Sequence, residues 1–104
     1  ESPKDENTRV SPLQVRVSDL DSNNHVNNEK YLEWSIREIP YDVYKRHSIT
    51  GIKINYLKSA FYGDEMRLET NVSKTDDDVL VHQSVKKDTD ETVCLIELCM
   101  RKRE

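Results

Sequence analysis

The stretch Asp19–Trp34, DLDSNNHVNNEKYLEW, joins a cluster of polar residues to the start of an amphipathic helix. Asn27 or Asn28 can cap this helix, Glu29 lies in the first turn, where the helix dipole favours negative charge, and Pro40 ends it. The apolar face is predicted to carry Leu32, Ile36 and Ile39, widened by Tyr31 and Trp34. The stretch therefore predicts one long helix with a single buried side, and residues 41–47 add a short helical piece.

From Thr50 onward the chain has the period of two that is typical of half-buried strands. Turn-forming clusters at 62–64, 75–78 and 88–91 divide it into four segments, for which we expect an antiparallel meander. Their apolar faces carry Ile52, Ile54 and Tyr56; Met66, Leu68, Thr70 and Val72; Val79, Val81, Gln83 and Val85; and Cys94, Ile96, Leu98 and Met100. The last segment is apolar on both sides, so it is predicted to lie inside the sheet.

Before the helix, Leu13, Val15 and Val17 alternate with polar residues and predict a strand that runs into the Asp21 segment. Residues 1–11 are polar and without periodicity, so we interpret them as a linker and residues 12–104 as the domain. One strand, one long helix and four more strands predict an α+β fold, in which a curved antiparallel sheet wraps around the helix.

Composition narrows the class of protein. With 104 residues, 35% hydrophobic and 35% charged, the core is modest, and we expect a partner surface to complete any large apolar cavity. The net charge of -4 argues against nucleic-acid binding. The histidines and cysteines lack the spacing of a metal site, and Cys94 and Cys99 point to opposite faces of one strand, so we expect free thiols. Without a membrane span or a signal pattern, we predict a cytoplasmic protein.

The polar cluster before the helix is the candidate reactive group. Asp21, Asn23 and His25 lie two residues apart, so in an extended segment their side chains would face the same way. His25 can act as a base near neutral pH, Asn23 can donate to a carbonyl oxygen, and Asp21 can orient a neighbour. The alternative is that Asp21 and Asn23 only form turns and caps. No Gly-x-Ser-x-Gly elbow occurs, so general-base hydrolysis fits better than a serine or cysteine nucleophile.

Two motifs carry a resemblance to a known family. The stretch 19–34 resembles the signature of the acyl-ACP thioesterases, in their second hotdog half, and INYLKSAFYGDE at 54–65 resembles that family's second motif. The resemblance implies two tandem hotdog domains that release a fatty acid from acyl carrier protein (ACP) in fatty acid biosynthesis, with this chain as the C-terminal half. It implies no metal and no cofactor. Its partners would be acyl-ACP or acyl-CoA and a second hotdog domain, in the same chain or in a homodimer.

Carried over by position, Asp21, Asn23 and His25 match the catalytic residues of the family, with Asp21 supporting the other two. We also expect the substrate to contact the residues Asn27, Tyr31, Trp34 and Ser59. Ser59 and Ala60 stand where the family usually has glutamate and, in plant members, cysteine. Asp21, Asp64 or Glu65 would then act as the base, or hydrolysis would be poor.

Two other functions stay open on the sequence. Single-hotdog acyl-CoA thioesterases share the Asp21–His25 segment and the helix. A hotdog domain that binds acyl chains or dimerises without turnover is the second alternative, and Ser59 is the residue that favours it.

Overall fold

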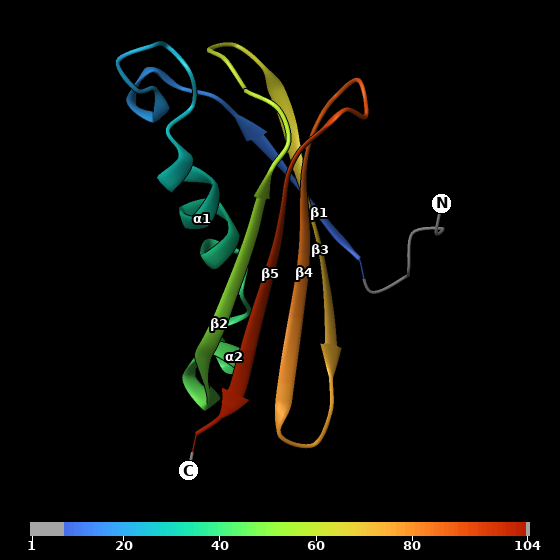
Figure 1. Ribbon diagram of the computed structural model, residues 1–104. Helices are drawn as coiled ribbons and strands as arrows, with labels where there is room; N and C mark the ends of the chain where they lie inside the picture. The colour runs from blue at the N-terminus through green and yellow to red at the C-terminus, as the bar shows by residue number, and fades with distance from the viewer. Residues whose placement is uncertain (1–7, 104) are drawn as a thin grey trace.

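The computed structural model describes residues 8–103. Its elements are β1 (Arg9–Gln14), the 3-10 helix η1 (Val17–Asp19), α1 (Asn28–Arg37), α2 (Tyr41–Arg46), β2 (His47–Tyr56), β3 (Glu65–Lys74), β4 (Asp78–Lys87) and β5 (Thr92–Lys102). All strand pairs are antiparallel and form one five-stranded sheet in the order β1-β3-β4-β5-β2. The helix α1 lies along one face of this sheet (Figure 1). The predicted α+β architecture is confirmed.

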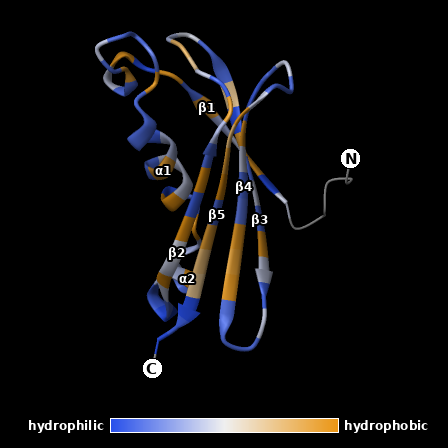
Figure 2. Ribbon diagram, viewed as in Figure 1, coloured by the Kyte–Doolittle hydropathy of each residue, from blue (hydrophilic) through white to orange (hydrophobic). Residues whose placement is uncertain are grey.

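The period of two sets the inner face of the sheet. Apolar and polar residues alternate along the strands (Figure 2), and the side chains of Leu68, Val81 and Leu98 are fully buried on the side of the helix. Burying each such side chain stabilises the fold by about 1.5–3 kcal/mol relative to an exposed one. The predicted faces of β3 and β4 are confirmed. The prediction that β5 lies inside the sheet is also confirmed, since β4 and β2 flank it.

The meander is only partly right. β3, β4 and β5 pair in chain order, but β2 pairs with β5 at one edge of the sheet, and β1 pairs with β3 at the other. The two-residue period of the sequence predicts which face of β2 is apolar, but it does not specify which strand pairs with β2. The segment after β2 is also attached to β5, because the N–H groups of Leu57 and Lys58 both donate to the Val93 carbonyl, at 2.8 and 3.1 Å.

The predicted helix is confirmed, but its buried face is rotated. Asn27 caps α1, and Tyr31, Trp34 and Ser35 are buried, whereas Ile36 is 36% exposed. The cause is a buried polar contact at the centre of the helix, where the Ser35 hydroxyl donates to Gln83 Oε1. The Gln83 amide nitrogen in turn donates to the Ser35 carbonyl (3.0 Å) and to Thr70 Oγ1 (3.3 Å). This network orients α1 on the sheet.

The first strand begins earlier than predicted. β1 starts at Arg9, so residues 9–11 belong to the sheet and the predicted domain boundary at residue 12 is too late. The remaining predicted linker residues, 1–7, lie outside the described part of the chain. β1 ends at Gln14, where its pairing partner β3 begins, and Val17 is exposed in η1. Pro12 is tolerated because β1 is an edge strand.

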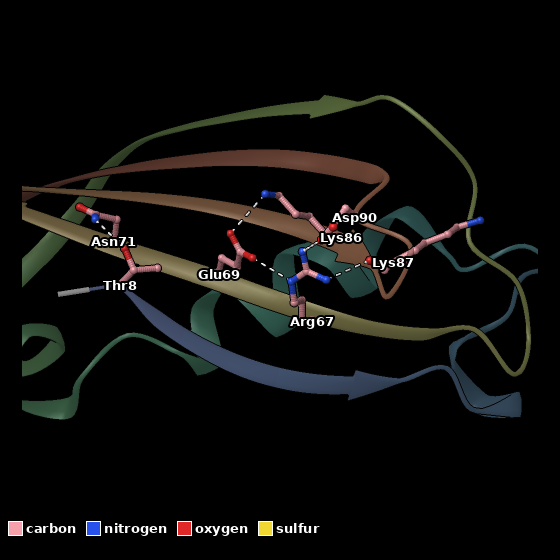
Figure 3. Close-up of polar contacts among 7 residues, drawn as sticks. All are labelled: Thr8, Arg67, Glu69, Asn71, Lys86, Lys87 and Asp90. Atoms are coloured by element: carbon pink, nitrogen blue, oxygen red, sulfur yellow. Dashed lines mark hydrogen bonds and ion pairs between the residues drawn. The ribbon is translucent and has the colours of Figure 1, made fainter. Parts of the chain in front are cut away.

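The outer face of the sheet carries a charged network (Figure 3). Glu69 on β3 accepts from Arg67 Nε at 2.8 Å and lies 3.3 Å from Lys86 Nζ on β4. Arg67 also pairs with Asp90 in the β4–β5 turn and donates to the Lys87 carbonyl at 3.1 Å. These contacts link β3 to β4 on the face of the sheet opposite α1. The candidate site is formed by α1 and the loops at its N-terminal end.

Candidate active site

A tight turn carries His25 to the end of the sheet where α1 begins. The Asp21 N–H donates to the His25 carbonyl (2.8 Å), and the Asn24 N–H donates to the Asp21 carbonyl (3.1 Å). Leu20 and Val26 pair across the base of the turn. Asn24 has a left-handed backbone with φ of 64°, a conformation that asparagine adopts more readily than most residues. The expected extended segment is therefore wrong.

Asp21 shapes this turn with its side chain. Its Oδ1 accepts from the N–H of Asn23 at 2.8 Å and from the N–H of His25 at 3.1 Å. Short Asp and Asn side chains compete with extended structure in this way. Asp21, Asn23 and His25 thus do not share one face of a strand. Asp21 and His25 line a common pocket, and Asn23 is exposed outside that lining.

Ser59 approaches His25 from a segment far along the chain. His25 pairs with Phe61 in an isolated antiparallel bridge, and the Val26 N–H donates to the Ala60 carbonyl at 2.9 Å. This pairing brings Ser59 Oγ within 3.2 Å of His25 Nδ1. The His25 ring also lies edge-on to Phe61, with centroids 4.9 Å apart. The imidazole is therefore held on both sides, and Ser59 contacts it directly.

The start of α1 adds backbone groups to the same place. Asn27 Oδ1 accepts from the Glu29 N–H at 3.1 Å, and the Asn27 carbonyl accepts from the Lys30 N–H at 2.9 Å. Among residues 8–103, the Asn28 N–H has no hydrogen-bond partner. Such amides at a helix start are donors for an anion or a polarised carbonyl. Tyr56, at the end of β2, donates its hydroxyl to the Asn28 carbonyl at 3.3 Å.

These groups surround one open cavity of about 450 Å³. Its lining residues come from the start of α1, from the loop before the helix and from the segment that follows β2. Its lining consists of Asp21, His25, Val26, Asn27, Asn28, Tyr31, Tyr56, Leu57, Lys58 and Ser59. Three of the four predicted substrate residues, Asn27, Tyr31 and Ser59, are in this set. Trp34 is not, because it lies one turn further along α1, buried and edge-on to Tyr31.

The protonation of the buried groups limits what they can do. Burial raises the pKa of Tyr31 to about 12, so its hydroxyl stays neutral. Burial likewise raises the pKa of the Cys94 thiol to about 12, and a thiolate nucleophile is not available there at neutral pH. The titratable side chains that line the cavity and are accessible include His25 and Asp21.

Of the three alternative bases named from the sequence, Asp21 lines the cavity, whereas Asp64 and Glu65 do not. Asp64 Oδ2 accepts from the Phe61 N–H at 2.9 Å and lies 3.5 Å from Lys87 Nζ, so this carboxylate stabilises the turn before β3. Glu65 begins β3 outside the lining. Neither side chain is positioned to replace the missing glutamate at Ser59.

Five residues of the lining were not among the predicted site residues: Val26, Asn28, Tyr56, Leu57 and Lys58. Tyr56 was interpreted chiefly as a core residue, but it is 43% exposed because β2 is an edge strand. Tyr56 lies only three residues before the predicted site residue Ser59, and this short spacing could have indicated that Tyr56 lines the same cavity.

Within the described residues, no group of three or more His, Cys, Asp or Glu side chains could hold a metal ion. None of the helices in residues 8–103 is long and apolar enough to cross a membrane.

The architecture is that of the hotdog-fold thioesterases. A structure described as an oleoyl thioesterase from Lactobacillus plantarum superposes with a TM-score of 0.88 at 26% identity, covering 99% of this chain and 41% of that chain. The 12:0-ACP thioesterase from Umbellularia californica superposes with a TM-score of 0.86 at 22% identity, covering 99% of this chain and 39% of that chain.

The family model for the acyl-ACP thioesterase C-terminal domain matches residues 2–102, and the chain belongs to this family. A dodecanoyl-[acyl-carrier-protein] hydrolase from Cinnamomum camphora, a chloroplastic protein, is 34% identical over 61 residues, which are 59% of this chain and 16% of that protein. The chain therefore spans a small part of this curated relative and about two-fifths of the two solved structures.

Proposed function

We propose that the protein hydrolyses the thioester of a fatty acyl-ACP to the free fatty acid, and that this chain supplies the catalytic hotdog domain. The observation that carries the proposal is the position of His25. Its imidazole is held by the turn and by Phe61 in an open cavity whose lining also includes Asn28. Family membership and the names of the relatives, which act on acyl-ACP, support the choice of substrate.

In this proposal His25 is the base and Asn28 supplies the oxyanion donor. A neutral imidazole takes the proton of the attacking group, and the backbone N–H donates to the carbonyl oxygen as charge develops on it. Asp21 positions His25 through its bond to the His25 N–H. Asn23 does not line the cavity, and it is proposed to join the catalytic residues by donating a hydrogen bond to the substrate once the acyl group is bound.

The substrate would enter along the residues that line the cavity. Asn27, Tyr31 and Ser59 are proposed to contact the thioester end. Trp34 is proposed to act on the acyl chain indirectly, by supporting the Tyr31 ring, whose centroid lies 5.5 Å from its own.

A second hotdog unit is the proposed partner of this domain. Within residues 8–103, no strand pairs with the outer edge of β2, and Ile52, Tyr56 and Leu57 on or beside this edge are 45%, 43% and 47% exposed. Pairing a second unit with this edge would cover these side chains and close the cavity. We propose that the unit is a preceding half of the same protein, because the solved relatives are more than twice as long as this chain. A homodimer is the alternative.

Two other functions are tested by the same experiment. Acyl-CoA in place of acyl-ACP is the first, and acyl binding without turnover, favoured by Ser59, is the second. The proposed location is the cytoplasm, although the name of the Cinnamomum camphora relative places that protein in the chloroplast.

The test is thiol release by the natural full-length protein on acyl-ACP and acyl-CoA of several chain lengths, with His25→Ala as the matched variant. We expect release from acyl-ACP, and a loss of about 10²- to 10⁴-fold in His25→Ala, as for other positioned bases. His25→Ala should keep the melting temperature, because the side chain is only half-buried. No release from either substrate contradicts the proposal, and equal release by His25→Ala contradicts the assignment of the base.

A further inference from the structure

We infer that Ser59 is a nucleophile, which takes the acyl group as an acyl-serine ester before water releases the acid. This inference rests on the proposed function, because it concerns the route of the same reaction. The observation behind it is the contact of Ser59 Oγ with His25 Nδ1 at 3.2 Å, within the reach of a nucleophile and its base.

The contact is built by the backbone on both sides. The Val26 N–H donates to the Ala60 carbonyl at 2.9 Å, and His25 pairs with Phe61, so the residues next to Ser59 and His25 are locked to each other. The N–H groups of Leu57 and Lys58 are held by the Val93 carbonyl at 2.8 and 3.1 Å. The backbone therefore holds the two residues where Ser59 Oγ can reach the imidazole.

Ser59 is also open to a substrate. It is an exposed residue in the lining of the cavity, which it shares with His25 and Asn28. A nucleophile, its base and a free backbone donor thus line one cavity, which is the arrangement that acyl transfer needs.

Other nucleophiles on this side of the sheet are less suitable. Cys94 is fully buried, and Tyr31 is 2% exposed. Lys58 Nζ lies 2.6 Å from Glu91 Oε2, so its amine is already engaged in an ion pair. Ser59 is the hydroxyl that meets both requirements, access and a base.

The covalent route balances without any further reactant. His25 Nδ1 takes the proton of Ser59 Oγ as the oxygen attacks the thioester carbon, and the C–S bond breaks. The leaving thiolate receives that proton from the imidazolium. Water then attacks the acyl-serine ester, with His25 taking one of its protons, and the C–O bond to Ser59 breaks. Return of the proton to Ser59 Oγ restores the enzyme and releases the acid.

The competing role for Ser59 is orientation of the ring. If Nδ1 carries the proton, it donates to Ser59 Oγ, and Nε2 would activate water directly. In that case no acyl group reaches Ser59. A nucleophilic Ser59 passes through an acyl-serine ester, whereas an orienting Ser59 does not, and the presence of this intermediate can be measured.

The first readout is partition between water and added hydroxylamine, using the natural full-length protein. One acyl group is presented on three thiols: ACP, coenzyme A and N-acetylcysteamine. A common acyl-serine gives the same ratio of hydroxamate to acid from all three, because the thiol has left before the ratio is decided. A ratio that changes with the thiol overturns the inference.

The second readout is the mass of the peptide that contains Ser59, after acid quench during the first turnover. We expect a gain equal to the acyl group in the wild type and in the control Ser73→Ala, an exposed serine of β3 outside the cavity. Ser59→Ala should lose at least about 10²-fold in turnover, as nucleophile removal does elsewhere, with an unchanged melting temperature. Turnover of Ser59→Ala within about fivefold of the wild type overturns the inference and leaves the proposed function standing. Absence of thiol release by the wild type overturns both the acyl-serine inference and the proposed function.

Discussion

Replacing Gln83 by leucine is expected to destabilise the domain strongly, although the volume of the side chain is nearly kept. Gln83, Ser35 and Thr70 are 2%, 0% and 2% exposed, and the glutamine links the centre of α1 to β3 and β4. In Gln83→Leu, Ser35 Oγ and Thr70 Oγ1 lose their shared partner inside the core. Water cannot replace it without opening the contact between helix and sheet.

The magnitude follows from the groups left unpaired. Each buried polar group without a partner costs about 1–3 kcal/mol, so two of them cost about 2–6 kcal/mol. For a domain of this size, 1 kcal/mol corresponds to about 4–8 °C in melting temperature. Taking about 3 kcal/mol, the melting temperature of Gln83→Leu should fall by about 12–24 °C.

Thermal unfolding followed by far-UV circular dichroism measures this effect. The matched control is the triple variant Ser35→Ala, Thr70→Val, Gln83→Leu, which removes every polar group of the network together. It should be more stable than Gln83→Leu alone, since replacing all partners by apolar groups is close to neutral. A fall of less than about 4 °C in Gln83→Leu, or a triple variant less stable than the single one, would refute the reasoning.

Three further predictions concern the cavity. Asp21→Asn keeps an acceptor for the N–H groups of Asn23 and His25, so it should retain stability, whereas Asp21→Ala should lose about 0.5–1.5 kcal/mol in urea unfolding. Equal stability of the two variants contradicts the positioning role. Asn27→Ala removes the cap of α1 and should cost about 1 kcal/mol, measured in the same way, while Asn27→Asp should cost little. Ser59→Glu should remove the acyl-serine and raise thiol release above that of the wild type, because it supplies the base that the family usually has at this position. Release at or below the wild-type rate would contradict that.

Much of the local structure was predictable because its causes are local. A cap at Asn27 and a break at Pro40 define α1, and alternation along β3 and β4 defines their buried faces. The family could also be predicted, because its motifs at 19–34 and 54–65 are continuous stretches. The match over residues 2–102 confirms it. The catalytic roles of Asp21, Asn23 and His25 stay predictions.

Contacts between distant segments were decided only in the tertiary structure. β2 lies beside β5, the buried face of α1 turns toward Ser35, and Ser59 meets His25 across 34 positions of the chain. The reason is physical. Propensity, capping and periodicity act within a few residues and specify which face of an element is buried. The partner of that face depends on register and packing among elements that are far apart in sequence, and these are determined only when the whole core is assembled.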